Sequence, residues 1–453
     1  MGELLDFELE DDVVVNPTKK RKKIIGLDDL LSDHYKQKGS LVENSRRATH
    51  RRSYSSDEDE VDVGEAKLSR CVEECQKEMG RIYGEDESAF WGLQIFGDQK
   101  PPPKSVSPDL KTCVSLESLK SMELDSLVEV HPEKGETFLE RLLVDGWLLK
   151  LVLVKGHLNE SIAKWTFNLM LYSSIEVLST SACDFWCTVL SPKNKTDLSI
   201  KIDWMPKYTE VKEALEIYGF IINTPSKFSS TVNLGDSDHI GPPQNIRAWM
   251  KFIAAGCQVR SSFAVFSTSE TEELLAIVIS LYLDRQLLGL SMILHDCTFS
   301  VLNYFRNNEW KSSCEKVAIS IASRVPCDIN SLRIVESIMA TDSRSKQLRS
   351  AVAYQLLSNC FDNKFTDAED MLAFLISINV KDNSCDLFKI YIYLVLTENW
   401  LLYNSTTREN SLMKDMWGVF LRNCSCQISS TDLRSHASKV RSKASYLVQG
   451  SLK

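Results

Sequence analysis

The chain has 453 residues, 43% of them hydrophobic, so a core large enough for two or three domains of about 150 residues is possible. Its formal net charge of −9 argues against a protein that binds nucleic acid over its whole surface, although a local basic patch remains possible. The thirteen cysteines are scattered and odd in number. We interpret them as reduced core residues of an intracellular protein, not as a secreted disulfide framework.

The first eight residues are acidic and lack the cationic and apolar regions of a secretory signal. The longest apolar stretches lie near 274–283 and 387–396. Both are interrupted by polar residues and are too short for a bilayer core of about 30 Å. We therefore expect a soluble protein that makes no membrane contact.

Residues 1–64 have alternating acidic and basic blocks and few aromatic residues. Such a composition buries too little apolar surface to offset the entropy lost on ordering. We expect this region to be a disordered tail that carries short motifs.

A basic cluster follows Pro17 in this tail. Its five consecutive cations are Lys19, Lys20, Arg21, Lys22 and Lys23. Clustered cations on an extended peptide are typical of a nuclear-import signal, which an acidic groove binds. The alternatives are a solvated charge run or a nucleic-acid-binding tail. We predict a nuclear protein.

A short leucine motif comes next, with Leu27, Leu30, Leu31 and Tyr35 on one face of a helix. A helix of this length is marginal in water by itself. We therefore expect it to form on a partner's groove, as a docking peptide. The alternative is a frayed helix that packs on the protein's own core.

Three serines of the N-terminal quarter are candidate phosphorylation sites. Ser55 and Ser56 precede four carboxylates, which suits a kinase that reads acidic residues downstream, and Ser107 precedes a proline. Phosphorylation would add about −1.5 to −2 charges at each site. The acidic run could equally serve only to keep the tail soluble.

Residues 65–112 form a second region with three parts. Residues 66–83 have the apolar stripe of an amphipathic helix. An aromatic cluster follows at Phe90–Phe96, and a stiff proline-rich linker at 101–108. The aromatic cluster needs a surface to cover, either on this protein or on a partner.

Residues 113–453 are predicted to form an all-helical body, with breaks at prolines and polar clusters. Strand patterns are scarce; the best candidate is Leu198–Asp203, and 263–266 is weaker. The fold class is therefore all-α, as an irregular HEAT-like α-solenoid or a helical bundle. No residue-level repeat decides between the two. The expected helices cover 136–155, 161–179, 181–190, 209–219, 244–256, 271–303, 311–324, 331–341, 345–359, 367–379, 384–403, 409–422 and 431–448.

We find no reaction centre in the chain. Phosphate loops, dinucleotide fingerprints, nucleophile elbows and zinc-protease motifs are all missing. His295, Asp296 and Cys297 are adjacent, so on a helix they point in different directions and form no triad by themselves. Three cysteine pairs lack a second pair at zinc-finger spacing, and we interpret them as structural: Cys71 and Cys75, Cys183 and Cys187, and Cys424 and Cys426. We expect neither an enzyme nor a cofactor.

The last predicted helix is basic. It carries Arg434, Lys439, Arg441 and Lys443, then Lys453, and no acid follows Asp432. These cations could contact a phosphate backbone. We favour the simpler explanation, in which cations near a helix C-terminus stabilise its dipole.

The order of these features resembles a known family. A basic cluster leads into Ile25-Gly26-Leu27-Asp28-Asp29-Leu30-Leu31, a helical segment ends in Tyr83-Gly84-Glu85-Asp86, and an all-helical body follows. This order resembles the plant proteins with the CANIN (coiled-coil SMC six and NSE five interacting) domain, which are relatives of non-SMC-element subunit six of the SMC five/six complex.

The resemblance implies a non-enzymatic subunit that supports chromatin recruitment and DNA repair by recombination. Its partners would be a second helical non-SMC-element subunit and an SMC coiled coil, with weak or indirect DNA contact and no small-molecule substrate. Carried over by position, Leu27, Leu30, Leu31 and Tyr35 would contact the complex. The alternatives are a helical scaffold of another nuclear assembly, in transcription or ubiquitin-ligase assembly, and an unrecognised enzyme with a site around His295 and Cys297.

Overall fold

The computed structural model describes residues 91–104, 108, 132–191, 200–221, 243–260, 264–365, 367–404 and 410–451. All of them belong to one compact unit, Lys77–Lys453. The predicted tail 1–64 and the predicted helix 66–83 lie outside the described residues.

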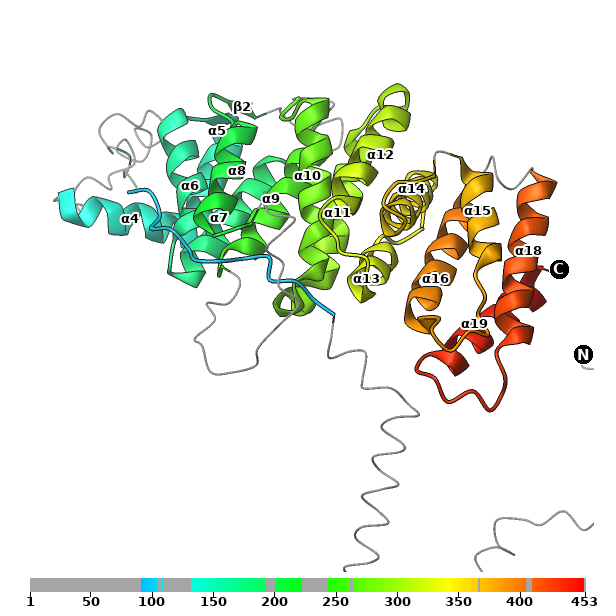
Figure 1. The fold of residues 1–453 in the computed structure, drawn as a ribbon. Coiled ribbons are helices and arrows are strands. Elements are labelled where there is room, and N and C mark those ends of the chain that lie inside the picture. Colours follow the sequence, from blue (N-terminus) through cyan, green and yellow to red (C-terminus); the bar gives the residue numbers. More distant parts are fainter. Residues whose placement is uncertain are drawn as a thin grey trace, which may run out of the picture. The chain divides into compact units, whose positions relative to one another are not determined.

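The described chain is all-α, as the sequence predicts (Figure 1). Its α-helices are α4 (Pro132–Val144), α5 (Trp147–Lys155), α6 (Glu160–Tyr172), α7 (Glu176–Val189), α8 (Tyr208–Ile217), α9 (Ile246–Gln258), α10 (Thr268–Ser280), α11 (Ser291–Tyr304), α12 (Asn307–Ala322), α13 (Ile329–Ser337), α14 (Ser343–Cys360), α15 (Ala368–Ser377), α16 (Leu387–Tyr403), α18 (Ser411–Gln427) and α19 (Ala437–Ser451). Two short 3-10 helices, η3 (Leu281–Leu283) and η4 (Arg285–Leu290), lie between α10 and α11.

Each helix packs mainly against helices close to it in sequence. The helices α10, α12, α14 and α16 pack one on the next, and α16 is followed by α19. On the N-terminal side, α7, α9 and α11 form a similar series. Contacts that reach only to the next few helices are the defining property of a solenoid, in which each unit stacks on its neighbour. The fold therefore agrees with an irregular helical solenoid.

Polar N-caps determine where several helices begin. The side chains of Ser267, Asp342 and Asp386 accept hydrogen bonds from backbone N–H groups in the first turns of α10, α14 and α16, respectively. These bonds satisfy donors that have no partner inside the helix, and each cap is worth about 1 kcal/mol.

Three predicted helices are divided in the structure, and one of them, 161–179, is broken at residues 173–175 between α6 and α7. The segment 136–155 is broken at Gly146, which separates α4 from α5. The segment 271–303 becomes α10, η3, η4 and α11, with a bend of 107° between Thr268–Leu283 and Arg285–Tyr304. Asp284 sits at this bend and caps η4 through the backbone N–H of Gln286. The apolar run continues through the bend, so hydrophobicity alone does not reveal it.

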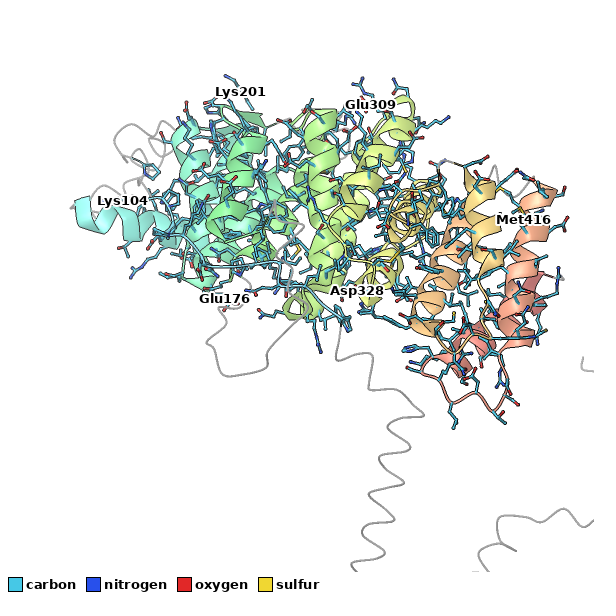
Figure 2. The ribbon with its side chains drawn as sticks, in the orientation of Figure 1. Lys104, Glu176, Lys201, Glu309, Asp328 and Met416 are labelled. Carbon is cyan, nitrogen blue, oxygen red and sulfur yellow. A yellow bond between two sulfur atoms is a disulfide. The ribbon has the colours of Figure 1, made fainter. Side chains whose placement is uncertain are left out.

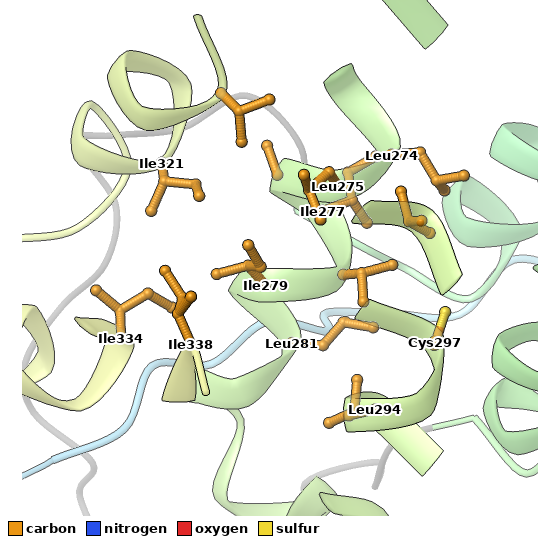
Figure 3. Packing of buried hydrophobic residues seen from close by; sticks show 14 of the residues in the cluster. Leu274, Leu275, Ile277, Ile279, Leu281, Leu294, Cys297, Ile321, Ile334 and Ile338 are labelled. Atoms are coloured by element: carbon orange, nitrogen blue, oxygen red, sulfur yellow. The ribbon is translucent and has the colours of Figure 1, made fainter. Parts of the chain in front are cut away.

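The core is best seen at α10 (Figure 3). From Leu274 to Ile279 every residue of this helix is fully buried. Helix α10 packs against α11, α12 and α13, so it is covered on several sides. A helix that is apolar all round is expected in such a central position. Each fully buried leucine or isoleucine contributes about 1.5–3 kcal/mol relative to an exposed one.

Strand structure is minimal in the described residues. His157–Leu158 (β1) pairs in parallel with Lys201–Ile202 (β2), and β2 lies inside the predicted strand Leu198–Asp203. Residues 264–266, from the weaker strand prediction, are not in a strand.

The prediction of reduced cysteines is wrong for one pair. Cys327 and Cys360 form a disulfide between the turn before α13 and the last residue of α14. Thirty-three residues separate them in sequence, and only the packing of α13 beside α14 brings them together. The buried free thiols Cys183, Cys257 and Cys297 agree with the structural interpretation. Figure 2 shows the side chains of the described residues.

Among the described helices, no single one is long and apolar enough to cross a membrane. The bent pair Thr268–Leu283 and Arg285–Tyr304 meets the length and composition requirement only when taken together.

Candidate interaction surfaces

Most of the sites predicted from sequence lie outside the described residues. These are the basic cluster Lys19–Lys23, the leucine motif with Leu27, Leu30, Leu31 and Tyr35, and the serines Ser55, Ser56 and Ser107. Phe90 also lies outside, but the rest of the aromatic cluster is described.

The described N-terminal segment Trp91–Lys104, here called the strap, lies along the helical body (blue in Figure 1). Its backbone bonds to the body at widely spaced points. The N–H of Leu93 donates to the carbonyl of Leu283 at 2.9 Å, and the N–H of Gly97 donates to the carbonyl of Gly219 at 2.8 Å. Phe96 and Phe220 form an antiparallel bridge. The body thus holds the strap as a groove holds an added strand.

Apolar side chains of the strap extend this attachment. Leu93, Ile95 and Phe96 are 7%, 3% and 4% exposed, so they belong to the core. The ring of Phe96 meets that of Phe220 edge to face, with centroids 5.8 Å apart. Such aromatic pairs add about 0.5–1.5 kcal/mol beyond the area that they bury. The aromatic cluster, from Trp91 to Phe96, therefore covers the protein's own body.

The first residues of the strap are fixed by a polar anchor. The ring of Trp91 lies against the guanidinium of Arg333 at 4.4 Å and that of Arg285 at 5.5 Å. The N–H of Gly92 donates to Oδ1 of Asn330 at 2.7 Å. Gly92 has φ +114°, and a Cβ there would come within 2.7 Å of the Arg285 side chain. A glycine is therefore required at this contact.

An apolar groove of about 220 Å³ lies next to this anchor. Arg333, which contacts Trp91, is one of its lining residues, together with Leu288, Met292 and Met339. Leu288, Met292 and Met339 are 48%, 68% and 49% exposed, so apolar surface remains uncovered beside the strap.

His295 and Cys297 lie in different environments. His295 lines the groove, whereas Cys297 is fully buried in the core. Burial raises the pKa of the Cys297 thiol well above its usual range, and the nearby Cys257 adds to the rise. A nucleophilic cysteine needs a depressed pKa and access to substrate, so Cys297 is unsuited to that role.

The described residues hold no group of three or more His, Cys, Asp or Glu side chains that could bind a metal ion. Cys183 and Cys187 on α7 approach to 4.0 Å between sulfur atoms, but no third ligand joins them. Cys424 is buried and Cys426 is exposed, so that pair faces two different environments.

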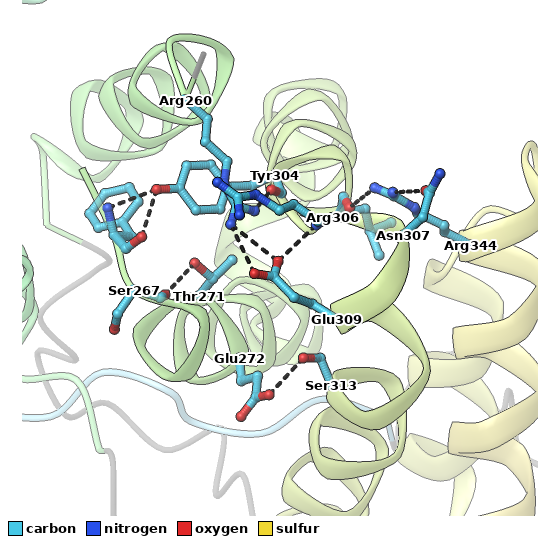
Figure 4. A network of polar contacts seen from close by, with 12 residues as sticks. Arg260, Ser267, Thr271, Glu272, Tyr304, Arg306, Asn307, Glu309, Ser313 and Arg344 are labelled. Atoms are coloured by element: carbon cyan, nitrogen blue, oxygen red, sulfur yellow. Dashed lines mark hydrogen bonds and ion pairs between the residues drawn. The ribbon is translucent and has the colours of Figure 1, made fainter. Parts of the chain in front are cut away.

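A polar network joins the central helices (Figure 4). The guanidinium of Arg260, just after α9, pairs with the Glu309 carboxylate of α12 at 3.1 Å and also donates to the carbonyl of Tyr304. The hydroxyl of Tyr304 donates to the carbonyl of Phe266 at 2.6 Å. Arg344 of α14 donates to the carbonyl of Leu302 at 3.0 Å. These bonds fix α9, α11, α12 and α14 relative to each other, and we assign them a structural role.

The C-terminal cations are not placed as expected. Helix α19 runs from Ala437 to Ser451, so Lys439, Arg441 and Lys443 lie in its first half. Its last turn contains no basic residue. Because the N-terminal end of a helix dipole is positive, these cations gain nothing from the dipole. The explanation favoured from sequence is therefore wrong for α19.

No known family model matches this chain, and no curated protein matches it.

Sequence reasoning missed the residues that hold the strap, namely Asn330, Arg333 and Leu283. They lie about 190–240 residues after the strap, and no local pattern marks them. The dense aromatic cluster was the signal in the sequence that this segment packs on another surface, because so much apolar area must be covered.

Proposed function

We propose that this protein is a non-enzymatic subunit of a nuclear SMC five/six-type complex. In this proposal, the N-terminal motifs capture the partners and the helical body serves as the scaffold that holds them. The family resemblance in the sequence supports the partners and the compartment. The architecture of the described body supports a scaffold.

The observation that carries the scaffold proposal is the attachment of the strap. The chain joins the body through Trp91, which stacks on Arg333, and through the buried Leu93 and Phe96. A docking motif in residues 27–35 would therefore be tethered to a fixed point on the body. Such tethering raises the effective concentration of a second contact once the first has formed.

The test is affinity purification of the tagged full chain from nuclear extract, followed by mass spectrometry. The informative variant is Leu30→Glu with Leu31→Glu, which places two charges on the apolar face of the motif. The matched control is Leu4→Glu with Leu5→Glu, another leucine pair of the N-terminal region. Recovery of SMC-complex subunits with the wild type and the control, but not with the variant, is expected.

The strap also determines how a truncation should be made. Removal of residues 1–112 would delete three buried core residues and unfold part of the body, so loss of binding would be ambiguous. Removal of Met1–Gln76 leaves the compact unit complete.

Recovery of a different nuclear assembly in the affinity purification would discard the SMC assignment. Equal recovery with the Leu30/Leu31 variant would discard the docking motif.

A further inference from the structure

A second groove lies at the C-terminal end of the body, between α16, α18 and α19. Its volume is about 730 Å³, larger than that of the groove beside the strap. Its apolar lining comes from all three helices and includes Leu402, Met413, Trp417, Leu421, Tyr446 and Leu447.

Large apolar side chains remain uncovered here. Leu402 is 47% exposed and Tyr446 is 70% exposed. Helices α18 and α19 are the last in the described chain, where they pack on α15, α16 and each other. Exposed apolar side chains that gather in one groove indicate a surface that another molecule covers.

The lining of the groove includes a glycine inside a helix. Gly418 lies midway along α18, where glycine costs about 1 kcal/mol relative to alanine. A Cβ at this position would come within 3.4 Å of Nη1 of Arg422. A side chain at position 418 would therefore crowd the Arg422 guanidinium, which lines the same groove.

Helices α18 and α19, which form two sides of the groove, carry a net positive charge, in contrast to the chain as a whole. Residues 410–453 contain seven Lys or Arg and two Asp, whereas the full chain has a net charge of −9. One of the two, Asp432, pairs with Arg434 at 2.7 Å. Glu398 lines the groove, but Lys443 neutralises it at 2.7 Å. Lys414 and Arg422 also line the groove, together with the second acid, Asp415.

We propose that this groove binds an amphipathic helix of a protein partner, with an apolar stripe and flanking carboxylates. The stripe would cover Leu402, Trp417 and Tyr446, and the carboxylates would meet Lys414 and Arg422. Between Met413 and Arg422 the groove follows α18 for about 14 Å, which matches about two and a half turns of a bound helix. This inference stands on the groove and does not depend on the SMC assignment.

The same features disfavour the other occupants. A second copy placed on this face would bring one positive surface against another. A DNA backbone would satisfy the cations but would leave the apolar lining exposed to water. Only an acidic amphipathic helix complements both the charge and the lining.

The test measures fluorescence anisotropy of three labelled probes against the full chain. The first probe is a sixteen-residue designed helix with leucines on one face and glutamates on the other. The second has lysine in place of each glutamate, and the third is a DNA duplex of twenty base pairs. Saturable binding of the glutamate probe is expected, at least about tenfold tighter than that of the lysine probe.

Surface variants locate the binding. Leu402→Glu and Tyr446→Glu change exposed side chains in the groove. Each should raise the Kd of the glutamate probe by about tenfold or more. Leu433→Glu is the matched control, because Leu433 is 88% exposed and lies between α18 and α19, outside the groove lining. Lys414→Glu with Arg422→Glu should weaken binding of the glutamate probe. The double variant should no longer bind the glutamate probe more tightly than the lysine probe.

Three results would overturn the proposal. The first is binding of the glutamate probe that Leu402→Glu and Tyr446→Glu leave unchanged. The second is a preference of the groove for DNA that these same variants abolish. The third is a wild-type dimer, seen by sedimentation, that Leu402→Glu converts to a monomer, which would make a second copy the occupant.

Discussion

The side-chain oxygen of Asn330 accepts a hydrogen bond from the backbone N–H of Gly92 at 2.7 Å, across 238 residues of sequence. Asn330 is only 2% exposed, and its amide also donates to Asp328 at 3.3 Å. This bond joins the start of the strap to α13, beside the contact of Trp91 with Arg333. Because the Asn330 side chain is buried, losing the Gly92 N–H would leave its oxygen unsatisfied.

Substitution at Gly92 should loosen the strap. We expect Gly92→Ala to destabilise the attached state by about 1–3 kcal/mol, since alanine is strained at φ +114° and would collide with Arg285. The measurement is hydrogen exchange of residues 91–97. Gly97→Ala is the control, because a Cβ there meets only ordinary contacts, at 3.7 Å or more. Equal protection in both variants would contradict the anchor.

Removal of a strap side chain should lower the stability of the whole body. Phe96→Ala is expected to cost about 3–5 kcal/mol, because it empties a buried site beside Phe220. Urea unfolding measures this loss. Phe299→Ala, at a phenylalanine that is 44% exposed on α11, should cost far less. If both variants unfold at the same urea concentration, the strap is not part of the core.

The Arg260–Glu309 pair should make stability depend on pH in the acid range. The backbone N–H of Arg306 is the main cause that holds the pKa of Glu309 below its usual range, and the Arg260 guanidinium lowers it further. A carboxyl group with a depressed pKa in the folded state stabilises the protein above its unfolded pKa of about 4.3. This contribution is lost as the pH falls through the lower, folded pKa.

Glu309→Gln should therefore remove part of the acid-induced fall in melting temperature, because glutamine does not titrate. Melting curves between pH 6 and pH 3 are the measurement. Glu315→Gln, at an exposed position of the same helix, is the control and should leave the acid dependence as it is. An unchanged pH profile in Glu309→Gln would show that the pair does not contribute.

Reduction of the Cys327–Cys360 disulfide should destabilise the protein. The bond closes a loop over 33 positions, and cross-linking a loop of that size stabilises a fold by about 4 kcal/mol on the chain-entropy account. Dithiothreitol should lower the melting temperature of the wild type and have no effect on Cys327→Ser. Identical melting of the oxidised wild type and Cys327→Ser would contradict a stabilising bond.

Thiol labelling should separate exposed cysteines from buried ones. Cys426 is exposed and should react quickly with iodoacetamide in the folded protein. Cys297 is fully buried, and its raised pKa keeps the thiol protonated, so it should react only after unfolding. Peptide mapping by mass spectrometry distinguishes the two. Rapid labelling of Cys297 would reopen the possibility of a site around His295.

The helical class of the body was predictable because it depends on local pattern. Apolar residues at helical spacing located the described α-helices, although the predicted ends of α6, α7 and α19 differ from the observed ones by several residues. Breaks inside continuous apolar runs were harder to predict. At the bend between α10 and α11, Asp284 caps a new turn, yet the hydrophobicity continues on both sides of it.

Features that depend on distant residues could not be predicted. The strap needs Asn330 and Leu283, and the disulfide needs α13 beside α14, so both arise only when the helices stack. The positive groove shows the same limit. The sequence shows Lys414 and Arg422 of α18, but only the packing of α16, α18 and α19 places them beside an uncovered apolar lining.

The sequence by itself determined the helical class, the scarcity of strands and the motifs that suggest a nuclear binding protein, since each is encoded within a few consecutive residues. The tertiary structure decided which surfaces are covered and which remain open. Leu93, Ile95 and Phe96 of the strap are buried on the body, whereas Leu402 and Tyr446 in the C-terminal groove are exposed. Burial is a property of the whole fold, because it depends on contacts between residues that are far apart in the chain.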